Sequence, residues 1–166
     1  MKNGIIQELN CFAGFQTLIG YVDVKSSPVY FYVQLNSNFD TINTTIPFDK
    51  EILNVGGAMN RTSGIFKAPQ NGIYSFSFTG LAWFPASSSR VVIYVQMYLN
   101  GNGMGSGVAD EDNTAGQYET YSFQSVLNLK AGDQIGIEIY QLSTGAYLRA
   151  GFTQYSGYLM EEIAVA

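Results

Sequence analysis

The clearest hydrophobic pattern in the chain lies between Ser63 and Trp83. Large aromatic residues alternate there with small polar ones: Tyr74, Phe76 and Phe78 share one parity, and Ser75, Ser77 and Thr79 share the other. A period of two predicts a β-strand with one buried face. The small side chains of the other parity predict that a neighbouring strand or subunit approaches this strand closely.

A turn is predicted immediately before this strand. Pro69-Gln70-Asn71-Gly72 has the composition of a tight turn, with Gly72 suited to a positive φ. The preceding Ile65–Ala68 is apolar enough to form a strand of its own. We therefore expect the two strands to pair as a β-hairpin at the centre of an all-β domain.

Further strands are predicted at short intervals from Pro28 onward, separated by turn residues. They cover Val29–Leu35, Thr45–Phe48, Ile52–Val55, Val91–Leu99, Tyr118–Leu129, Ile135–Tyr140 and Phe152–Ile163. Asn100-Gly101 is expected to form a turn, and the glycine-rich, acidic segment 102–116 is assigned no strand. No helical period occurs after residue 27. Eight to ten antiparallel strands in one domain favour a two-sheet sandwich of the jelly-roll type.

Residues 1–27 differ in pattern from the rest. Ile5, Leu9, Phe12 and Ile19 have a spacing like that of a coiled coil, but Gly14 and Gln16 interrupt it. A short helix, or a strand over residues 20–24, fits this segment equally well. We interpret residues 1–27 as a neck or linker and residues 28–166 as one globular domain.

Composition narrows the possible functions. Only 13% of the 166 residues are charged and 46% are apolar, so the surface is expected to be poor in charge and prone to association. The net charge of −5 and the eight Lys and Arg residues argue against nucleic acid as a partner. The chain has no histidine, which removes the commonest general base and the commonest metal ligand. No enzymatic motif is visible.

The single cysteine, Cys11, excludes both an internal disulfide and a cysteine-based zinc site. It is either a buried thiol or half of an interchain disulfide. No apolar run is long enough to cross a membrane, and Glu8 interrupts any apolar region of a signal peptide near the N-terminus. Either the protein is not exported, or a signal peptide precedes the given sequence, so the expectation of export rests on other features.

The strands carry short motifs that together resemble the globular head domain of complement C1q, a relative of the tumour-necrosis-factor fold. In chain order they are Phe31, Ile46–Asp49, Asn54, Met59-Asn60, Ser63–Pro69, Gly72–Phe76, Leu99–Gly101, Leu127–Asp133 and Tyr155–Leu159. Each motif is weak alone, but their order and spacing extend over about four-fifths of the chain. Two features depart from the family pattern: Gly136 stands where the family usually carries Trp, and no collagen repeat precedes the domain.

The resemblance implies a ten-stranded, antiparallel jelly roll that assembles as a homotrimer. It also implies a secreted, extracellular protein that recognises ligands and has no catalytic role. Several members of the family bind calcium near the trimer apex. By resemblance, Glu111 and Glu119 lie close to those positions.

The acidic residues Asp110, Glu111, Asp112 and Glu119 are the only concentration of oxygen ligands suited to Ca²⁺. A solvated acidic loop without a metal is the alternative interpretation. If calcium binds, it would relieve repulsion between carboxylates that three subunits bring together.

Aromatic residues with outward parity are candidates for ligand or trimer contacts: Trp83, Tyr94, Tyr98, Tyr140 and Tyr158. Each could equally be a residue that covers a sheet, and Trp83 could be a core residue. Asn43-Thr44-Thr45 and Asn60-Arg61-Thr62 are glycosylation sequons, which favour export.

Three functions follow for testing. The first is a recognition domain of innate immunity that binds microbial surfaces, glycans or receptors through the avidity of three sites. The second is a cytokine-like or organiser ligand that clusters one cell-surface receptor. The third is a trimerisation module whose residues 1–27 carry the active part.

Overall fold

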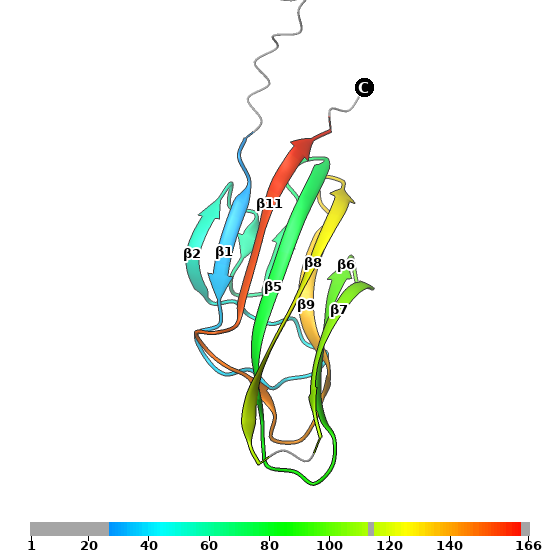
Figure 1. Cartoon of the computed structure of the whole chain (residues 1–166). Coiled ribbons are helices and arrows are strands. Elements are labelled where there is room, and N and C mark those ends of the chain that lie inside the picture. Colours follow the sequence, from blue (N-terminus) through cyan, green and yellow to red (C-terminus); the bar gives the residue numbers. More distant parts are fainter. Residues whose placement is uncertain (1–26, 113–114, 164–166) are drawn as a thin grey trace, which may run out of the picture.

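The computed structural model describes residues 27–112 and 115–163, which form eleven strands and no helix (Figure 1). The strands are β1 (Tyr30–Gln34), β2 (Lys50–Val55), β3 (Met59–Asn60), β4 (Ile65–Lys67), β5 (Gly72–Phe84), β6 (Val91–Leu99), β7 (Asn102–Glu111), β8 (Gln117–Leu129), β9 (Gln134–Leu142), β10 (Tyr147–Leu148) and β11 (Gln154–Glu162). This confirms an all-β fold. Eleven strands are close to the ten expected, since β3 and β10 have two residues each.

The strands form two antiparallel sheets packed face to face, as in a jelly roll (Figure 1). Sheet A contains β8, β5, β11, β1 and β2, with the short β10 extending β5 on the side of β11. Sheet B has the order β3-β4-β9-β6-β7. β1 begins and β11 ends at the same end of the sandwich, so both chain ends leave the domain together (Figure 1).

The core lies between the two sheets and is rich in aromatic rings. Tyr74, Phe76 and Phe78 of β5 are fully buried, as their alternation predicted, and Ile135, Ile137 and Ile139 of β9 bury the corresponding face of sheet B. Phe66 of sheet B lies with its ring centroid 5.2 Å from that of Phe76 in sheet A. Burial of such rings dominates the stability of a sandwich because each removes a large apolar area from water.

The hairpin predicted for residues 65–79 is wrong. β4 pairs with β3 and β9 in sheet B, whereas β5 pairs with β8, β10 and β11 in sheet A. The connection at Pro69 crosses from one sheet to the other, and this crossing lets the Phe66 ring face Tyr74 and Phe76 across the core. Gly72 is the first residue of β5 and does not have a positive φ.

Two other segments differ from the prediction. Thr45–Phe48 forms no strand, although Ile46 and Phe48 are fully buried, and its pairing is limited to a bridge between Thr45 and Glu138. Pro47 lacks the N–H that a regular ladder requires. Residues 102–111, which the sequence left unassigned, form β7. The predicted turn at Asn100-Gly101 joins β6 to β7, and both residues have a positive φ.

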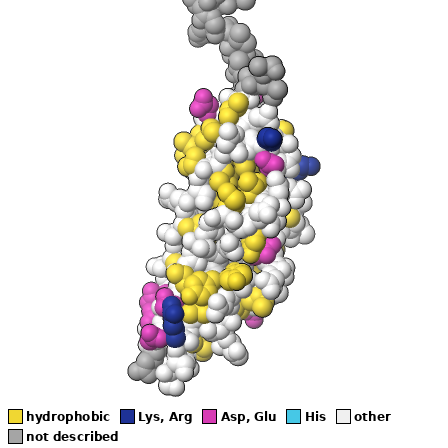
Figure 2. All heavy atoms as spheres, turned by 90° about the vertical axis from the view of Figure 1, so that its right-hand side faces the viewer, with side chains coloured by type: hydrophobic (Ala, Val, Ile, Leu, Met, Phe, Trp, Pro, Cys, Tyr) yellow, Lys and Arg dark blue, Asp and Glu magenta, His cyan; other side chains and the backbone are white. Residues whose placement is uncertain are grey.

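The surface keeps several apolar patches (Figure 2). In the part of the chain that the structure describes, no helix is long and apolar enough to cross a membrane. The proposed neck, residues 1–27, lies outside the described residues except for residue 27, and Cys11 lies outside them as well. The buried apolar residues of the described chain form one hydrophobic core.

Candidate functional site

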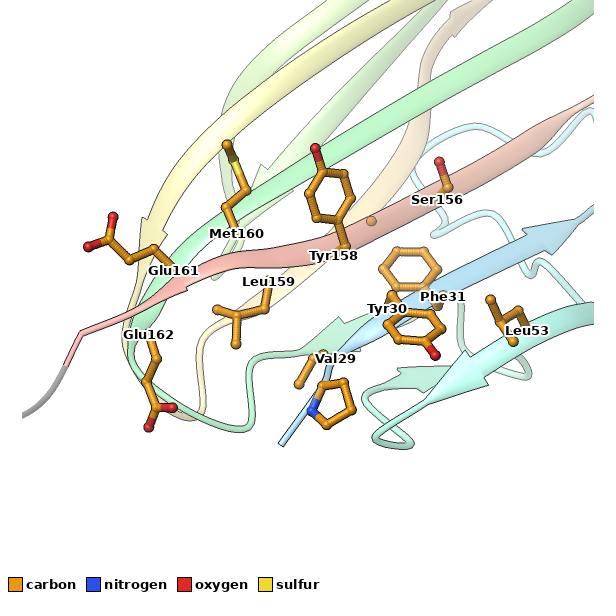
Figure 3. Close-up of a pocket in the computed structure, with 12 residues that line it drawn as sticks. Val29, Tyr30, Phe31, Leu53, Ser156, Tyr158, Leu159, Met160, Glu161 and Glu162 are labelled. Atoms are coloured by element: carbon orange, nitrogen blue, oxygen red, sulfur yellow. The ribbon is translucent and has the colours of Figure 1, made fainter. Parts of the chain in front are cut away.

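A hollow of about 500 Å³ opens on the outer face of sheet A, at the end where the two chain termini leave (Figure 3). β1, β2 and β11 form it. Tyr30 and Tyr158 lie directly opposite each other on neighbouring strands, and Leu53 of β2 lines the same hollow. Half of the Tyr158 side chain and 54% of Met160 are exposed, although both are large and apolar.

A transverse row of side chains continues from this hollow across sheet A. Tyr30 pairs with Tyr158, Tyr158 with Ser75, and Ser75 with Val126 of β8. Ser75 is much smaller than Tyr158 and Val126, which stand on either side of it. Val126 is 61% exposed and Tyr158 50%, so the described part of the chain leaves these two side chains largely uncovered.

The neighbouring residue of β11 shows why this strand can lie so close to the core. Gly157 pairs with Phe31 and Phe76, and its α-carbon faces their rings. A Cβ at this position would come within 2.6 Å of a carbon of the Phe76 ring and 2.7 Å of one of the Phe31 ring. Glycine is therefore required for the aromatic packing beneath the hollow.

A second aromatic cluster lies at the other end of sheet A. The Trp83 ring centroid is 4.7 Å from that of Tyr118 and 6.4 Å from that of Tyr147. The guanidinium carbon of Arg149 lies 4.8 Å from the Tyr118 ring centroid and 5.4 Å from that of Phe152, and Arg149 also donates a hydrogen bond to the Tyr118 hydroxyl. The pKa of Tyr147 is raised, mainly by a side-chain hydrogen bond with Tyr118 and to a smaller extent by desolvation.

The acidic residues lie at the end of the molecule opposite the chain termini, where Figure 2 shows carboxylates beside a basic side chain. Arg90 and Asp110 form an ion pair, with 2.7 Å between Nη2 of the arginine and Oδ2 of the aspartate. This contact raises the pKa of Arg90. Glu111 of β7 and Glu119 of β8 share a side-chain hydrogen bond, which is the main reason that the pKa of Glu119 is raised. The pair therefore bridges the edges of the two sheets.

One chain does not supply a complete calcium site from its described residues. No group of three or more carboxylate, His or Cys side chains suited to a metal occurs among them. The structure brings Glu111 and Glu119 together. Asp110 instead forms its ion pair with Arg90. Asp112 is exposed and lies near Arg90. Calcium needs six to eight oxygen ligands, so these residues fit it only if further chains contribute.

The predicted aromatic contact residues do point outward, but they do not form one site. Trp83 and Tyr158 lie on sheet A, whereas Tyr94, Tyr98 and Tyr140 lie on sheet B. Trp83 is half-buried against other aromatic rings outside the main core cluster. The sequons lie at exposed positions: Asn43 in a loop and Asn60 at the end of β3.

Sequence reasoning missed several exposed residues of sheet A. Tyr118 and Val126 have the outward parity of β8, the same signal that identified Tyr94, so they were within reach. Tyr30 is the first residue of β1, where the register was not defined, whereas Met160 has the parity of Tyr158 and was also within reach. Arg149 was not detectable, because only the fold brings it beside Tyr118 and Phe152.

Comparisons with known proteins agree with this architecture. The family model of the C1q domain matches residues 30–160. The complement C1q tumor necrosis factor-related protein 3 of Mus musculus is 28% identical over 136 residues, which are 81% of this chain and 52% of that protein. The Homo sapiens protein of the same name is 27% identical over the same shares. The chain thus spans about half the length of these curated relatives.

Solved structures show the same fold. The globular domain of zebrafish complement 1qA matches with a TM-score of 0.61 and 18% identity, over 81% of this chain and 99% of that one. The Eiger TNF of S. frugiperda matches with a TM-score of 0.62 and 10% identity, over 84% of this chain and 96% of that one. Together with the match over residues 30–160, the two-sheet jelly roll shows that the chain belongs to the C1q domain family.

Proposed function

We propose that this protein is a secreted, homotrimeric recognition domain that binds extracellular ligands on microbial surfaces, glycans or receptors, in the setting of innate immunity. The proposed activity is binding rather than catalysis. Three weak sites carried on one trimer would bind a repetitive surface with much higher avidity than a single site.

The observation that supports assembly is the outer face of sheet A. Tyr30, Tyr158 and Val126 stand exposed in a single row, with the small Ser75 between the last two. An exposed apolar surface of this kind is suited to contact another copy. Three copies is the number that the resemblance to C1q heads implies.

The second cluster of sheet A supports the same assembly. Trp, Tyr and Arg are the residues most enriched where interfaces gain their binding energy. Trp83, Tyr118 and Arg149 pack together at the end of sheet A opposite the first hollow. Contacts at both ends of one face would hold neighbouring subunits in a fixed orientation.

We also propose that calcium is shared between subunits through Glu111 and Glu119. Their mutual hydrogen bond and the raised pKa of Glu119 indicate two carboxyl groups that disfavour simultaneous ionisation. A divalent cation among several such pairs would stabilise the ionised forms and, by linkage, the trimer.

Light scattering tests this function directly. We expect a mass of three times the 18.2 kDa of one chain, with a higher melting temperature in calcium than in excess chelator. A trimer that is indifferent to chelator would contradict the calcium proposal alone. A monomer in both conditions would contradict the assembly and the avidity that depends on it.

A further inference from the structure

The outer face of sheet B carries a hollow of about 470 Å³ that the assembly proposed above leaves free. Three strands contribute to it: Tyr94 and Gln96 from β6, Ser106 from β7, and Tyr140 and Gln141 from β9. It lies in the interior of the sheet, because β6 is flanked by β7 on one side and by β9 on the other.

Two irregularities of the sheet shape this hollow. Tyr94 pairs with Gln141, but the next residue, Val95, pairs with Ile139, so Tyr140 is an extra residue that forms a β-bulge. The β6–β7 ladder also shifts register, between Gln96 and Tyr98. Bulges bend a strand and redirect its side chains. Tyr140 accordingly stands 59% exposed at the wall of the hollow.

The floor of the hollow is held in place by neighbours. The Tyr98 hydroxyl donates a hydrogen bond of 3.1 Å to Oε1 of Gln96. The Gln96 amide lies over Gly103, where a Cβ would come within 2.2 Å of Nε2. Gln96 is therefore oriented before any ligand arrives, which reduces the entropy lost on binding.

The chemistry of the lining is aromatic, polar and uncharged. The rings of Tyr94 and Tyr140 stack on no other ring among the described residues, and two side-chain amides and one hydroxyl accompany them. No charged side chain is among the residues that line the hollow. Apolar rings with a few placed hydrogen-bonding groups are typical of a small-molecule site.

This lining favours a sugar over a peptide or an anion. A pyranose presents an apolar face of C–H groups that can lie on a tyrosine ring, and hydroxyl groups that amides and Ser106 can bind. An extended peptide normally adds to a free sheet edge, but the backbone groups of β6 are already paired on both sides. An acidic ligand would meet no cation in the lining of a chain with net charge −5.

We propose that Tyr94 and Tyr140 form a binding site for a neutral sugar residue on the outer face of sheet B, with Gln96, Ser106 and Gln141 as its hydrogen-bonding partners. The proposal rests on the recognition function proposed above and assigns that function a ligand class and a location.

The test uses the full chain on an array of glycans that end in mannose, glucose, galactose or N-acetylglucosamine, with sialylated and sulfated glycans on the same slide. We expect binding to a neutral group, a loss of about tenfold or more in Tyr94→Ala and in Tyr140→Ala, and a change of about threefold or less in Tyr140→Phe. Met104→Ala is the matched control, because it truncates an exposed side chain of β7 outside the hollow.

The outcomes separate this inference from the broader function. Equal binding by wild type and both alanine variants, or binding to acidic glycans alone, would overturn the sugar site. A wild-type trimer that binds whole microbes or a protein receptor but no neutral glycan would overturn it as well, while the recognition function would stand. A monomer that binds none of these would contradict both proposals.

Discussion

The two outer faces of this sandwich have similar tyrosine-rich compositions but different backbones. On sheet A, β5 pairs with β8 along all 13 of its residues without a shift in register. On sheet B, β6 shifts register once against each of its neighbours. The first face is regular where β5 and β8 meet, whereas the second is bent and hollowed at its centre.

This difference in backbone suggests a difference in use. Around Ser75 the ladders to Tyr158 and to Val126 are regular, because the register shift between β11 and β5 lies beyond Leu159, so this part of sheet A can be repeated in another copy and can pack closely against it. A bulged face packs poorly against a flat partner, but it can enclose a small ligand between side chains of fixed orientation. Similar residues therefore serve assembly on one sheet and recognition on the other, according to the two proposals.

The largest expected effect comes from placing a charge on each face in turn. Tyr158→Asp should convert the trimer into monomers in light scattering, because it would bury an unpaired carboxylate at a subunit contact, at a cost of several kcal/mol. Tyr140→Asp, the matched change on sheet B, should leave the mass unchanged and reduce glycan binding.

The assignment of assembly to sheet A and recognition to sheet B would be wrong if Tyr140→Asp changed the mass and Tyr158→Asp did not. Loss of the trimer in Tyr140→Asp, with an intact trimer in Tyr158→Asp, would place the subunit contact on sheet B. Far-ultraviolet circular dichroism of both variants would show that each retains its sheet structure.

A smaller effect is expected from adding one methyl group to a glycine on each sheet. Gly157→Ala should lower the free energy of unfolding by about 1–3 kcal/mol, because its Cβ meets the buried rings of Phe31 and Phe76. Gly103→Ala should change it by less than about 0.5 kcal/mol, because its Cβ meets the end of the Gln96 side chain, which can rotate out of its hydrogen-bonded position, rather than a buried ring.

Urea unfolding of both variants at one protomer concentration measures the difference, since dissociation is coupled to unfolding. Gly103→Ala should still weaken glycan binding, because it displaces the Gln96 amide from the floor of the hollow. A stability loss in Gly103→Ala as large as that in Gly157→Ala would indicate that the bulged face is as tightly packed as the core beneath sheet A.

The sequence predicted the interior better than either outer face. Alternation identified the buried residues of β5 and β9 because burial on one face is a local property of a strand. It could not assign β4 and β5 to different sheets, since a four-residue connection fits a hairpin and a crossing equally well. The family resemblance supplied the architecture that local patterns left open.

For the outer surfaces, too, the sequence pattern predicted part of the arrangement and only the fold supplied the rest. Parity placed Tyr94, Tyr140 and Tyr158 outward, but only the strand order separates the first two from the third. β7 went unrecognised because Gly103, Gly105 and Gly107 lower its strand propensity. These glycines nevertheless belong to β7, which contributes Ser106 to the hollow on sheet B. The segment with the weakest strand pattern therefore forms part of a candidate functional site.

The smallest expected effect concerns the place where the two sheets meet. Glu111 lies on β7 of sheet B and Glu119 on β8 of sheet A, and their hydrogen bond raises the pKa of Glu119. A carboxyl group with a raised pKa in the folded state stabilises the fold below its unfolded pKa, about 4.3. That contribution is lost as the pH rises through the folded value.

Glu119→Gln should therefore melt at a higher temperature than the wild type at pH 7 in chelator, and the difference should shrink toward pH 4. Gln keeps the hydrogen bond to Glu111 but removes the second negative charge. Added calcium should raise the melting temperature of the wild type and not that of the variant, if the ion is shared through this pair. Scanning calorimetry at both pH values separates the effect of charge repulsion from the effect of calcium. Asp110→Asn is the control, because it removes a nearby carboxylate that is not part of the Glu111–Glu119 pair. If calcium stabilised both proteins equally, the ion would bind elsewhere and the calcium proposal for this pair would be wrong. Glu111 and Glu119 would then be only a proton-sharing contact between the two sheets.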